Sequence, residues 1–471
     1  MIPRKADTNL SALAERVWNS LLRVYLRTQT VVTPLLIFSV LAGAQALVFI
    51  HNVGPLTVPD IDMHLGATYA LATGQSFTEP TLTEISDGRD ISGEQLLTGD
   101  SRFLLLPAAR SDLIDSIINN PLSVDPSLAA QVTALTEQSG EQITASFRSN
   151  QYIFFSYIPQ ALGLKLGFVL DLSPLGGLTL ARVMNFLVYA ALFIIAIVII
   201  PTGKTLIAVI GATPMSVFCA SSLMADASVI GFITFFTALC MWLGQTHRRI
   251  GPILLVSLVF GGFFLCMLKY TYCPLILLPL VLAWSSFQRN RDRAIYLGGV
   301  LVLFLVVAMW WQSQYAYTPG GIHRYEANLA FLRAHFFSSA FTVLSNSLLS
   351  VWTILGDSPG VTRLSAAVIA LIWVAMLTSA RQTRLQVMSE KPAYGRLWLS
   401  ALLAFASIGL IYASLYLTWN DAADLRLGEF VEGFQLRYVI PLLPLLVVPL
   451  LSISGESGRH REQDTCRHPV V

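Results

Sequence analysis

Repeated runs of about 20 apolar residues restrict the fold of this chain more than any other feature of its sequence. The hydrocarbon core of a bilayer is about 30 Å thick, and an α-helix of about 20 apolar residues crosses it. Only helices and closed barrels satisfy their own backbone polar groups in lipid. Charged residues make up 12% of the 471-residue chain, whereas about 25% is usual in soluble domains. We therefore predict an all-α polytopic membrane protein.

The apolar runs predict about ten transmembrane helices. They lie at residues 31–50, 179–200, 205–223, 227–244, 251–268, 271–285, 295–312, 363–380, 397–418 and 438–453. Two interrupted apolar stretches, 153–170 and 336–355, are expected to be interfacial or re-entrant elements. The chain is thereby divided into an N-terminal tail (1–30), a transmembrane domain (31–453) and a polar C-terminal tail (454–471).

The distribution of charged residues predicts the orientation. Cytoplasmic segments beside membrane helices are enriched in Lys and Arg, and the N-terminal tail contains Arg4, Lys5, Arg16, Arg23 and Arg27. With this tail inside and an even number of helices, both termini are cytoplasmic. The other short cytoplasmic loops are then basic as well, and most acidic residues lie outside. We predict a multi-pass protein of the plasma membrane whose extracytoplasmic loop 51–178 is long enough for a small folded subdomain.

The segment from Pro59 to Gly74 follows the first predicted helix and contains Asp60, Asp62 and His64. Proline at the start, acids just after it and glycine at the end are typical of one short helix. At 100° per residue, Asp60 and His64 share a face while Asp62 points elsewhere. One interpretation is a general base or metal ligand at Asp60, with His64 oriented beside it. The other is that the acids only stabilise the helix N-terminus, and this short motif does not decide between them.

Further polar residues lie at the extracytoplasmic ends of other predicted helices. A carboxylate as deep as Asp226 usually faces a cavity or a partner, but it could equally cap the helix that begins at 227. Lys269 is either a ligand-binding residue or an anchor whose charged end reaches the membrane surface. Arg437 and Tyr438 stand at the start of the last predicted helix, and an arginine there is suited to bind a phosphate.

Motifs of several other protein classes do not occur in the sequence. There is no Walker A motif, no G-x-G-x-x-G after a strand and no H-E-x-x-H. Their absence disfavours ATP-driven transport by this chain alone and zinc-dependent proteolysis. Basic residues do not form a run interleaved with aromatic residues, so nucleic acid is not expected as a partner.

Several short segments, taken in order, resemble a known family. They are Pro59-Asp60…His64, Tyr157–Gly163, Arg182 with Asn185, Pro214-Met215…Ser222…Ala225-Asp226, Lys269-Tyr270, and Gln435-x-Arg437-Tyr438-x-x-Pro441. Together they resemble the bacterial membrane proteins of the domain of unknown function 2142 family, over roughly residues 31 to 453. Two positions depart from that family: Ile61 stands where Glu usually follows the Asp, and Leu436 stands where Gly usually precedes the Arg-Tyr pair.

That family is similar to the C-type glycosyltransferases, polytopic enzymes whose active site lies outside the cytoplasmic membrane. The resemblance implies a glycosyltransferase C-like fold, a sugar donor linked to polyprenyl phosphate and an envelope glycan as acceptor. It implies Asp60 as catalytic base or metal ligand, which makes a divalent metal a candidate cofactor. The full set of candidate catalytic residues is Asp60, Asp62 and His64. The candidate substrate-binding residues are Asp226, Lys269, Arg437 and Tyr438, with Lys269 and Arg437 on the lipid phosphate.

Two other functions stand as alternatives: a transporter or flippase of a lipid-linked envelope precursor, and a non-catalytic scaffold for envelope assembly. A transporter needs polar groups near the middle of the membrane. The predicted helices 31–50, 205–223, 295–312 and 397–418 contain no Asp, Glu, Lys or Arg. The candidate residues gather on one side instead, which favours chemistry at the membrane surface over passage through it and leaves the scaffold open.

Overall fold

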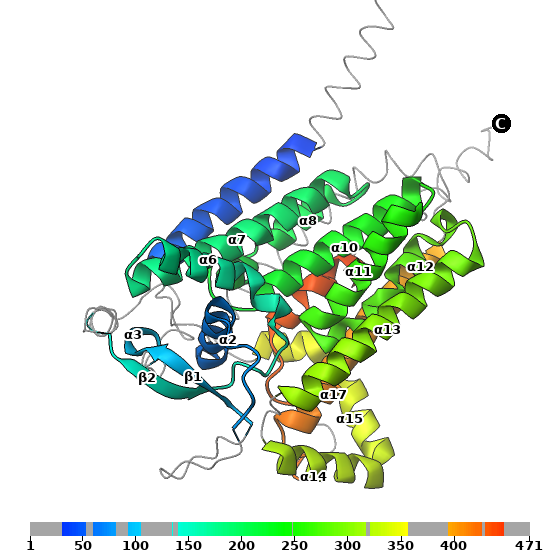
Figure 1. Ribbon diagram of the computed structural model, residues 1–471. Helices are drawn as coiled ribbons and strands as arrows, with labels where there is room; N and C mark the ends of the chain where they lie inside the picture. Colours follow the sequence, from blue (N-terminus) through cyan, green and yellow to red (C-terminus); the bar gives the residue numbers. More distant parts are fainter. Residues whose placement is uncertain are drawn as a thin grey trace, which may run out of the picture.

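The structure is a computed structural model that describes residues 31–52, 60–81, 93–104, 134, 140–246, 248–316, 321–356, 394–425 and 429–446. Within these residues, five helices are long and apolar enough to cross a membrane. They are Val31–Asn52, α7 (Pro174–Ile199), α10 (Asp226–Thr246), α13 (Asn290–Gln314) and the Trp398–Thr418 part of α17 (Tyr394–Thr418). Together with α11 (Pro252–Leu268) they form one elongated bundle (Figure 1). The prediction of a helical, multi-pass membrane protein is confirmed.

The stretch 205–223, predicted as one helix, forms two short helices, α8 (Lys204–Gly211) and α9 (Pro214–Ala220). Pro214 has no N–H to continue the first helix, which leaves carbonyl groups near the break without their usual partners. Side chains occupy them. Thr213 and Ser216 donate to the Ile210 carbonyl. Tyr189 donates to the Gly211 carbonyl at 2.8 Å, and Gln45 donates to the Ala212 carbonyl at 2.9 Å.

Two more predicted spans are also interrupted near proline residues. The stretch 271–285 is split into a 3-10 segment η3 (Tyr270–Leu277), α12 (Leu278–Leu282) and η4 (Trp284–Ser286), with Pro274 inside the first. The last predicted span begins with two 3-10 turns, η5 (Leu436–Tyr438) and η6 (Ile440–Leu442), around Pro441. The predicted span 363–380 and the end of the last span lie outside the described residues.

Between the first helix and α7, the described residues form small elements at one end of the bundle (Figure 1). They are α2 (Ile61–Thr73), α3 (Ser101–Leu104), η2 (Phe154–Tyr157), α6 (Ile158–Val169) and an antiparallel pair of strands, β1 (Gln95–Asp100) and β2 (Gln142–Phe147). Leu97 and Phe147 are buried on the inner side of this sheet, where Phe147 meets Gly66 of α2. The sheet therefore holds α2 against the bundle.

The two apolar stretches predicted to be interfacial or re-entrant are both helical. The first, 153–170, comprises η2 and α6. The second, 336–355, is the continuous helix α15 (Phe336–Gly356), which packs with α14 (Gly321–Ala334) on α17. Phe337 and Leu348 of α15 are largely exposed, as befits an apolar helix at the margin of a bundle.

α6 and α7 approach each other closely through small residues. A Cβ added at Gly163 would lie 2.6 Å from the Cα of Ala181, and one at Gly167 would lie 2.7 Å from the Cα of Gly177. Both helices thus present a small residue at every fourth position, a spacing that lets helix backbones meet in membrane proteins. Because α2 rests on α6, this seam also determines where α2 lies.

We expect Gly163→Ala to destabilise the protein by about 1–3 kcal/mol, because the new methyl group meets backbone that cannot rotate away. Gly298→Ala in α13 is the matched control, since a Cβ there has nothing within 4 Å. It should be neutral or slightly stabilising, by up to about 1 kcal/mol. Thermal unfolding in detergent micelles measures both. Equal melting temperatures for the two variants would contradict the close α6–α7 contact.

Candidate functional site

Asp62 and His64 point in different directions from α2, as helical phase predicts, whereas the helix begins at Ile61 and leaves Asp60, which the sequence analysis placed inside it, just before its first residue. Asp60 precedes the helix in a left-handed conformation (φ 52°), and Gly74 ends the helix in another (φ 81°). His64 is buried, and its ring nitrogen Nδ1 lies 3.0 Å from the hydroxyl of Tyr157. Asp62 instead accepts two hydrogen bonds from Arg148, at 2.8 and 2.9 Å, outside the cavity described below.

Asp226, the first residue of α10, is positioned by the loop before it. The Arg182 guanidinium donates to the carbonyl of Ser221, at 2.7 Å, and to the last turn of the Val31–Asn52 helix. Asn185 donates to the carbonyls of Ser222 and Met224, and Gln160 to those of Leu223 and Met224. These three buried side chains come from α6 and α7, so the seam between those helices is tied directly to the position of Asp226.

Lys269 and Arg437 reach the same place because the chain leaves regular helix at both residues. Lys269 is an extended residue between α11 and η3, and Arg437 lies in the 3-10 turn η5. A hydrogen bond of 2.8 Å from the Tyr272 hydroxyl to the Tyr438 carbonyl joins the two segments. The Lys269 ammonium lies 4.0 Å from the centre of the Tyr438 ring, a favourable cation–π position.

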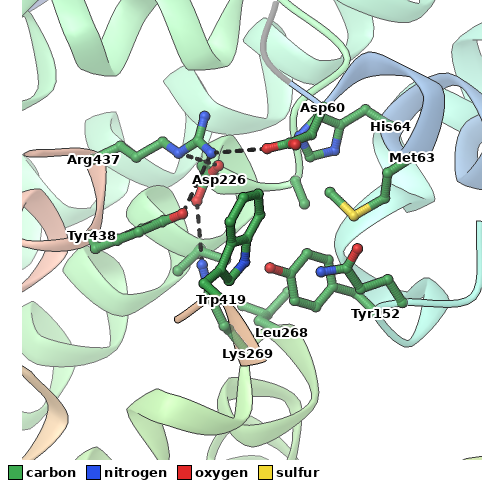
Figure 2. Close-up of a pocket in the computed structure, with 13 residues that line it drawn as sticks. Asp60, Met63, His64, Tyr152, Asp226, Leu268, Lys269, Trp419, Arg437 and Tyr438 are labelled. Carbon is green, nitrogen blue, oxygen red and sulfur yellow. Dashed lines mark hydrogen bonds and ion pairs between the residues drawn. The ribbon is translucent and has the colours of Figure 1, made fainter. Parts of the chain in front are cut away.

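The charged groups form a cluster with long contacts (Figure 2). Arg437 Nε lies 3.4 Å from an Asp226 oxygen, and Lys269 Nζ lies 4.0 Å from the other. Arg437 Nη2 lies 3.6 Å from Asp60 and 3.5 Å from the Tyr438 hydroxyl. A guanidinium bound bidentately to a carboxylate has contacts of about 2.7–2.9 Å. Among the described residues, two buried cations are therefore neutralised in charge but poorly supplied with close hydrogen-bond acceptors.

These residues line one cavity of about 30 Å³. That volume holds roughly two water molecules, so a larger ligand requires rim side chains to move. Trp419, which is 49% exposed, lies at the front of the cavity in Figure 2. The full lining is Asp60, Met63, His64, Gln151, Tyr152, Ala225, Asp226, Val229, Leu268, Lys269, Trp419, Arg437 and Tyr438.

His64 is a neutral imidazole in this site. Burial lowers its pKa to about 4, with Asp226 acting in the opposite direction and Arg437 in the same one. Near pH 7 the ring therefore contributes no charge. Its nitrogen Nε2 is buried and has no hydrogen-bond partner among the described residues.

The cavity brings together six of the seven residues proposed from the sequence: Asp60, His64, Asp226, Lys269, Arg437 and Tyr438. Asp62 is the seventh and pairs with Arg148 outside the lining. The sequence analysis did not identify Tyr152, Tyr157 or Trp419. Tyr157 begins the family-like segment Tyr157–Gly163, so the sequence did point to it as a candidate. No neighbouring sequence pattern identifies Tyr152 or Trp419 as site residues.

The residues here do not fit a metal held by several protein ligands. In the described part of the chain, no group of three His, Cys, Asp or Glu side chains converges. Asp60 and Asp226 share the Arg437 guanidinium, and each has a second cation at 4.0 Å, Arg148 for Asp60 and Lys269 for Asp226, so cations already balance the two carboxylates.

A bundle of apolar helices with a buried ion cluster at one end defines a polytopic membrane protein that carries a polar site. The chain belongs to the domain of unknown function 2142 family, described as predicted membrane proteins, and the match covers residues 43–446. This confirms the resemblance seen in the short segments. No curated protein and no solved structure matches the chain significantly.

We expect Asp226→Asn to destabilise the protein by about 3–5 kcal/mol, because it leaves the buried Arg437 and Lys269 without their shared counter-charge. Asp62→Asn is the control: its carboxylate is 36% exposed and should contribute under about 1 kcal/mol. Thermal unfolding in micelles compares the two. A smaller loss for Asp226→Asn than for Asp62→Asn would show that the cluster is not a stabilising one.

Proposed function

We propose that this protein transfers a sugar from a polyprenyl-phosphate carrier to a cell-envelope acceptor at the outer face of the membrane. One observation carries the proposal: Arg437, which is buried, and Lys269, whose side chain is 14% exposed, meet in a cavity where only contacts of 3.4 Å or longer join them to carboxylates. Such donors are placed for an anion that brings its own oxygen atoms. A phosphate at a membrane-facing site fits this requirement, and arginine binds phosphate well.

In this mechanism the cations stabilise the leaving group. The bond between the anomeric carbon and the phosphate oxygen breaks, and the polyprenyl phosphate departs with the electron pair. Arg437 and Lys269 offset the negative charge that develops on its oxygen, and they are already oriented before the reaction. Asp226 keeps both cations in place, and the Tyr438 ring supports Lys269.

Asp60 is the general base in the same proposal. Its carboxylate is 27% exposed at the edge of the cavity, whereas that of Asp226 is 9% exposed. Asp60 therefore reaches an acceptor arriving from outside, and Asp226 does not. The acceptor hydroxyl gives its proton to Asp60 while its oxygen forms the new bond to the anomeric carbon.

The proposed full architecture is glycosyltransferase C-like, with about ten transmembrane helices. The five long helices and the shorter apolar helices of the described residues supply most of them. The stretch 363–380 would add a further one. We propose a bacterial plasma-membrane location with both termini cytoplasmic.

Charge at the two ends of the bundle supports this orientation. The α10–α11 turn carries Arg248 and Arg249, while Arg289 precedes α13 and Arg291 and Arg293 lie in its first turn. A hydrogen bond from Ile250 to Ser286 joins the two connections. α2 lies toward the opposite end of the bundle (Figure 1). Its residue His64 and the preceding Asp60 line the cavity, which is therefore at that end. By the positive-inside rule, the cavity then faces outward.

The alternatives gain less support from the same structure. Broken helices in transporters often expose carbonyl groups that bind ions, but the carbonyls at the α8–α9 break are occupied by Thr213, Ser216, Tyr189 and Gln45. A scaffold has no need of buried cations with long contacts to their counter-charges. Surface chemistry on an anionic ligand accounts for both features.

We expect Asp60→Asn, expressed in a deletion strain, to lose the envelope glycan that the wild-type chain restores. General-base catalysis typically contributes about 10²–10⁴-fold in rate. Glycan composition, normalised to the amount of protein in the membrane fraction, measures the effect.

Asp171→Asn is a matched control for this experiment. Asp60 and Asp171 are the two non-glycine residues with positive φ in the described chain, at 52° and 50°, and Asp171 lies outside the cavity. The same substitution is thus made in the same backbone conformation. A wild-type glycan with Asp60→Asn, or an equal loss with Asp171→Asn, would refute the role of Asp60.

The orientation has a separate test in a variant without native cysteines. A membrane-impermeant thiol reagent added to intact cells should label Glu141→Cys, next to β2, and should not label Arg291→Cys, at the start of α13. Both positions are exposed in the structure, so access depends only on the side of the membrane. The reverse labelling pattern would place the cavity in the cytoplasm.

A further inference from the structure

His64 and Tyr157 form a buried pair beside the ion cluster. Their polar atoms Nδ1 and Oη lie 3.0 Å apart, and the two side chains are 2% and 0% exposed. They come from different elements, α2 and η2, which are separated by 93 positions in the chain. His64 also lines the cavity, and its ring lies next to Asp60 in Figure 2.

The available partners assign the tautomer of the imidazole. A neutral histidine has one N–H donor and one bare nitrogen acceptor. Among the described residues, the Tyr157 hydroxyl has Nδ1 as its hydrogen-bonding partner. If Nδ1 carried the proton, the buried tyrosine proton would have no acceptor, at a cost of about a full hydrogen bond. The satisfied arrangement has the tyrosine donating to Nδ1, which leaves the histidine proton on Nε2.

The surroundings keep both groups in these states. Burial lowers the pKa of His64 to about 4 and raises the pKa of the Tyr157 hydroxyl well above its ordinary value. The charged groups that act on His64 are Asp60 and Asp62 at the start of α2, Asp226 of α10 and Arg437 of η5. At neutral pH, therefore, the tyrosine remains a donor and the histidine remains uncharged.

The second ring nitrogen of His64, Nε2, points to a ligand. Nε2 of His64 is buried without a partner among the described residues, although a buried N–H group normally has one. Arg437, which lines the same cavity, likewise has its Nε without an aligned hydrogen bond. Two residues that line the cavity thus each have a buried nitrogen without a hydrogen bond.

We propose that Tyr157 is a positioning residue that fixes His64 with its proton on Nε2, so that His64 donates a neutral hydrogen bond to a phosphate oxygen held by Arg437 and Lys269. This inference rests on the proposed function for its phosphate-bearing ligand, and it changes the role of His64. The residue is a donor to the leaving group and not the partner of a general base at Asp60. Phosphate recognition then uses two cations and one neutral donor, each from a different segment of the chain.

The tautomer is tested by nitrogen NMR on the full chain, labelled with ¹⁵N-histidine, in lipid nanodiscs at pH 7. The signals of His64 are those that disappear in His64→Gln. We expect an unprotonated Nδ1 and a protonated Nε2 in the wild-type protein. Tyr157→Phe should shift the Nδ1 resonance, because it removes the hydrogen bond. Tyr189→Phe is the control, because it removes a different buried tyrosine hydrogen bond, from Tyr189 to the Gly211 carbonyl. It should leave the Nδ1 resonance of His64 unchanged.

Ligand binding provides the second measurement, with a short-chain polyprenyl phosphate, the corresponding alcohol and inorganic phosphate as probes. His64→Leu should weaken binding of the phosphate about tenfold, and His64→Gln, which keeps an N–H donor, should weaken it less. The alcohol should bind equally to all variants. Binding of the polyprenyl phosphate alone identifies a lipid ligand, whereas equal binding of inorganic phosphate identifies a free phosphate. Either ligand supports the donor role when its affinity falls in His64→Leu.

Two results would overturn the inference: a proton on Nδ1 of His64 in the wild-type protein, or equal phosphate affinity for wild-type and His64→Leu chains. Neither measurement involves sugar transfer. A chain that binds polyprenyl phosphate in a His64-dependent way but restores no envelope glycan would therefore reject the proposed reaction and leave the role of His64 standing.

Discussion

The attraction between Asp226 and its two cations is the interaction on which the rest of this structure depends. Removing three charges from water at the end of an apolar bundle is expensive unless they compensate one another. Here the compensation is arranged by segments from distant parts of the chain, and each supplies one charge. Arg182, Asn185 and Gln160 hold the loop before Asp226, while the Tyr272–Tyr438 hydrogen bond joins the two cationic segments.

Irregular backbone positions the charged residues of this cluster. Lys269 is an extended residue between two helical segments, Arg437 lies in a 3-10 turn, and Asp60 has a left-handed conformation. In a continuous helix, the direction of each side chain would be fixed by the helical period of about 3.6 residues per turn. The breaks, several of them beside proline, instead allow short segments to turn their charged ends toward a common point. Each of these three charged residues thus lies where regular helix is interrupted or begins.

Much of this could be predicted from the sequence, and the remainder could not for physical reasons. Apolar runs predicted the membrane bundle because lipid leaves the backbone few alternatives. Helical phase separated Asp62 from His64 because the period of a helix is fixed, whereas the left-handed conformation of Asp60 just before the helix was not predicted. The predicted helix at 205–223 was wrong in its continuity, since composition reports only apolarity, although Pro214 marked the break. The pairing of His64 with Tyr157 depends on tertiary packing, which no local pattern contains.

The glycine seam between α6 and α7 has a consequence for how this family can vary. At Gly163 the atoms that an added Cβ would meet are backbone atoms of α7, namely the Cα and N of Ala181 and the carbonyl oxygen of Leu180, at 2.6–2.9 Å. A smaller side chain at position 181 therefore makes no room, because every residue type has these atoms. Relatives that keep this distance between α6 and α7 are expected to keep glycine at position 163, whatever stands opposite it, and a larger residue there would move α6 and the α2 helix that rests on it.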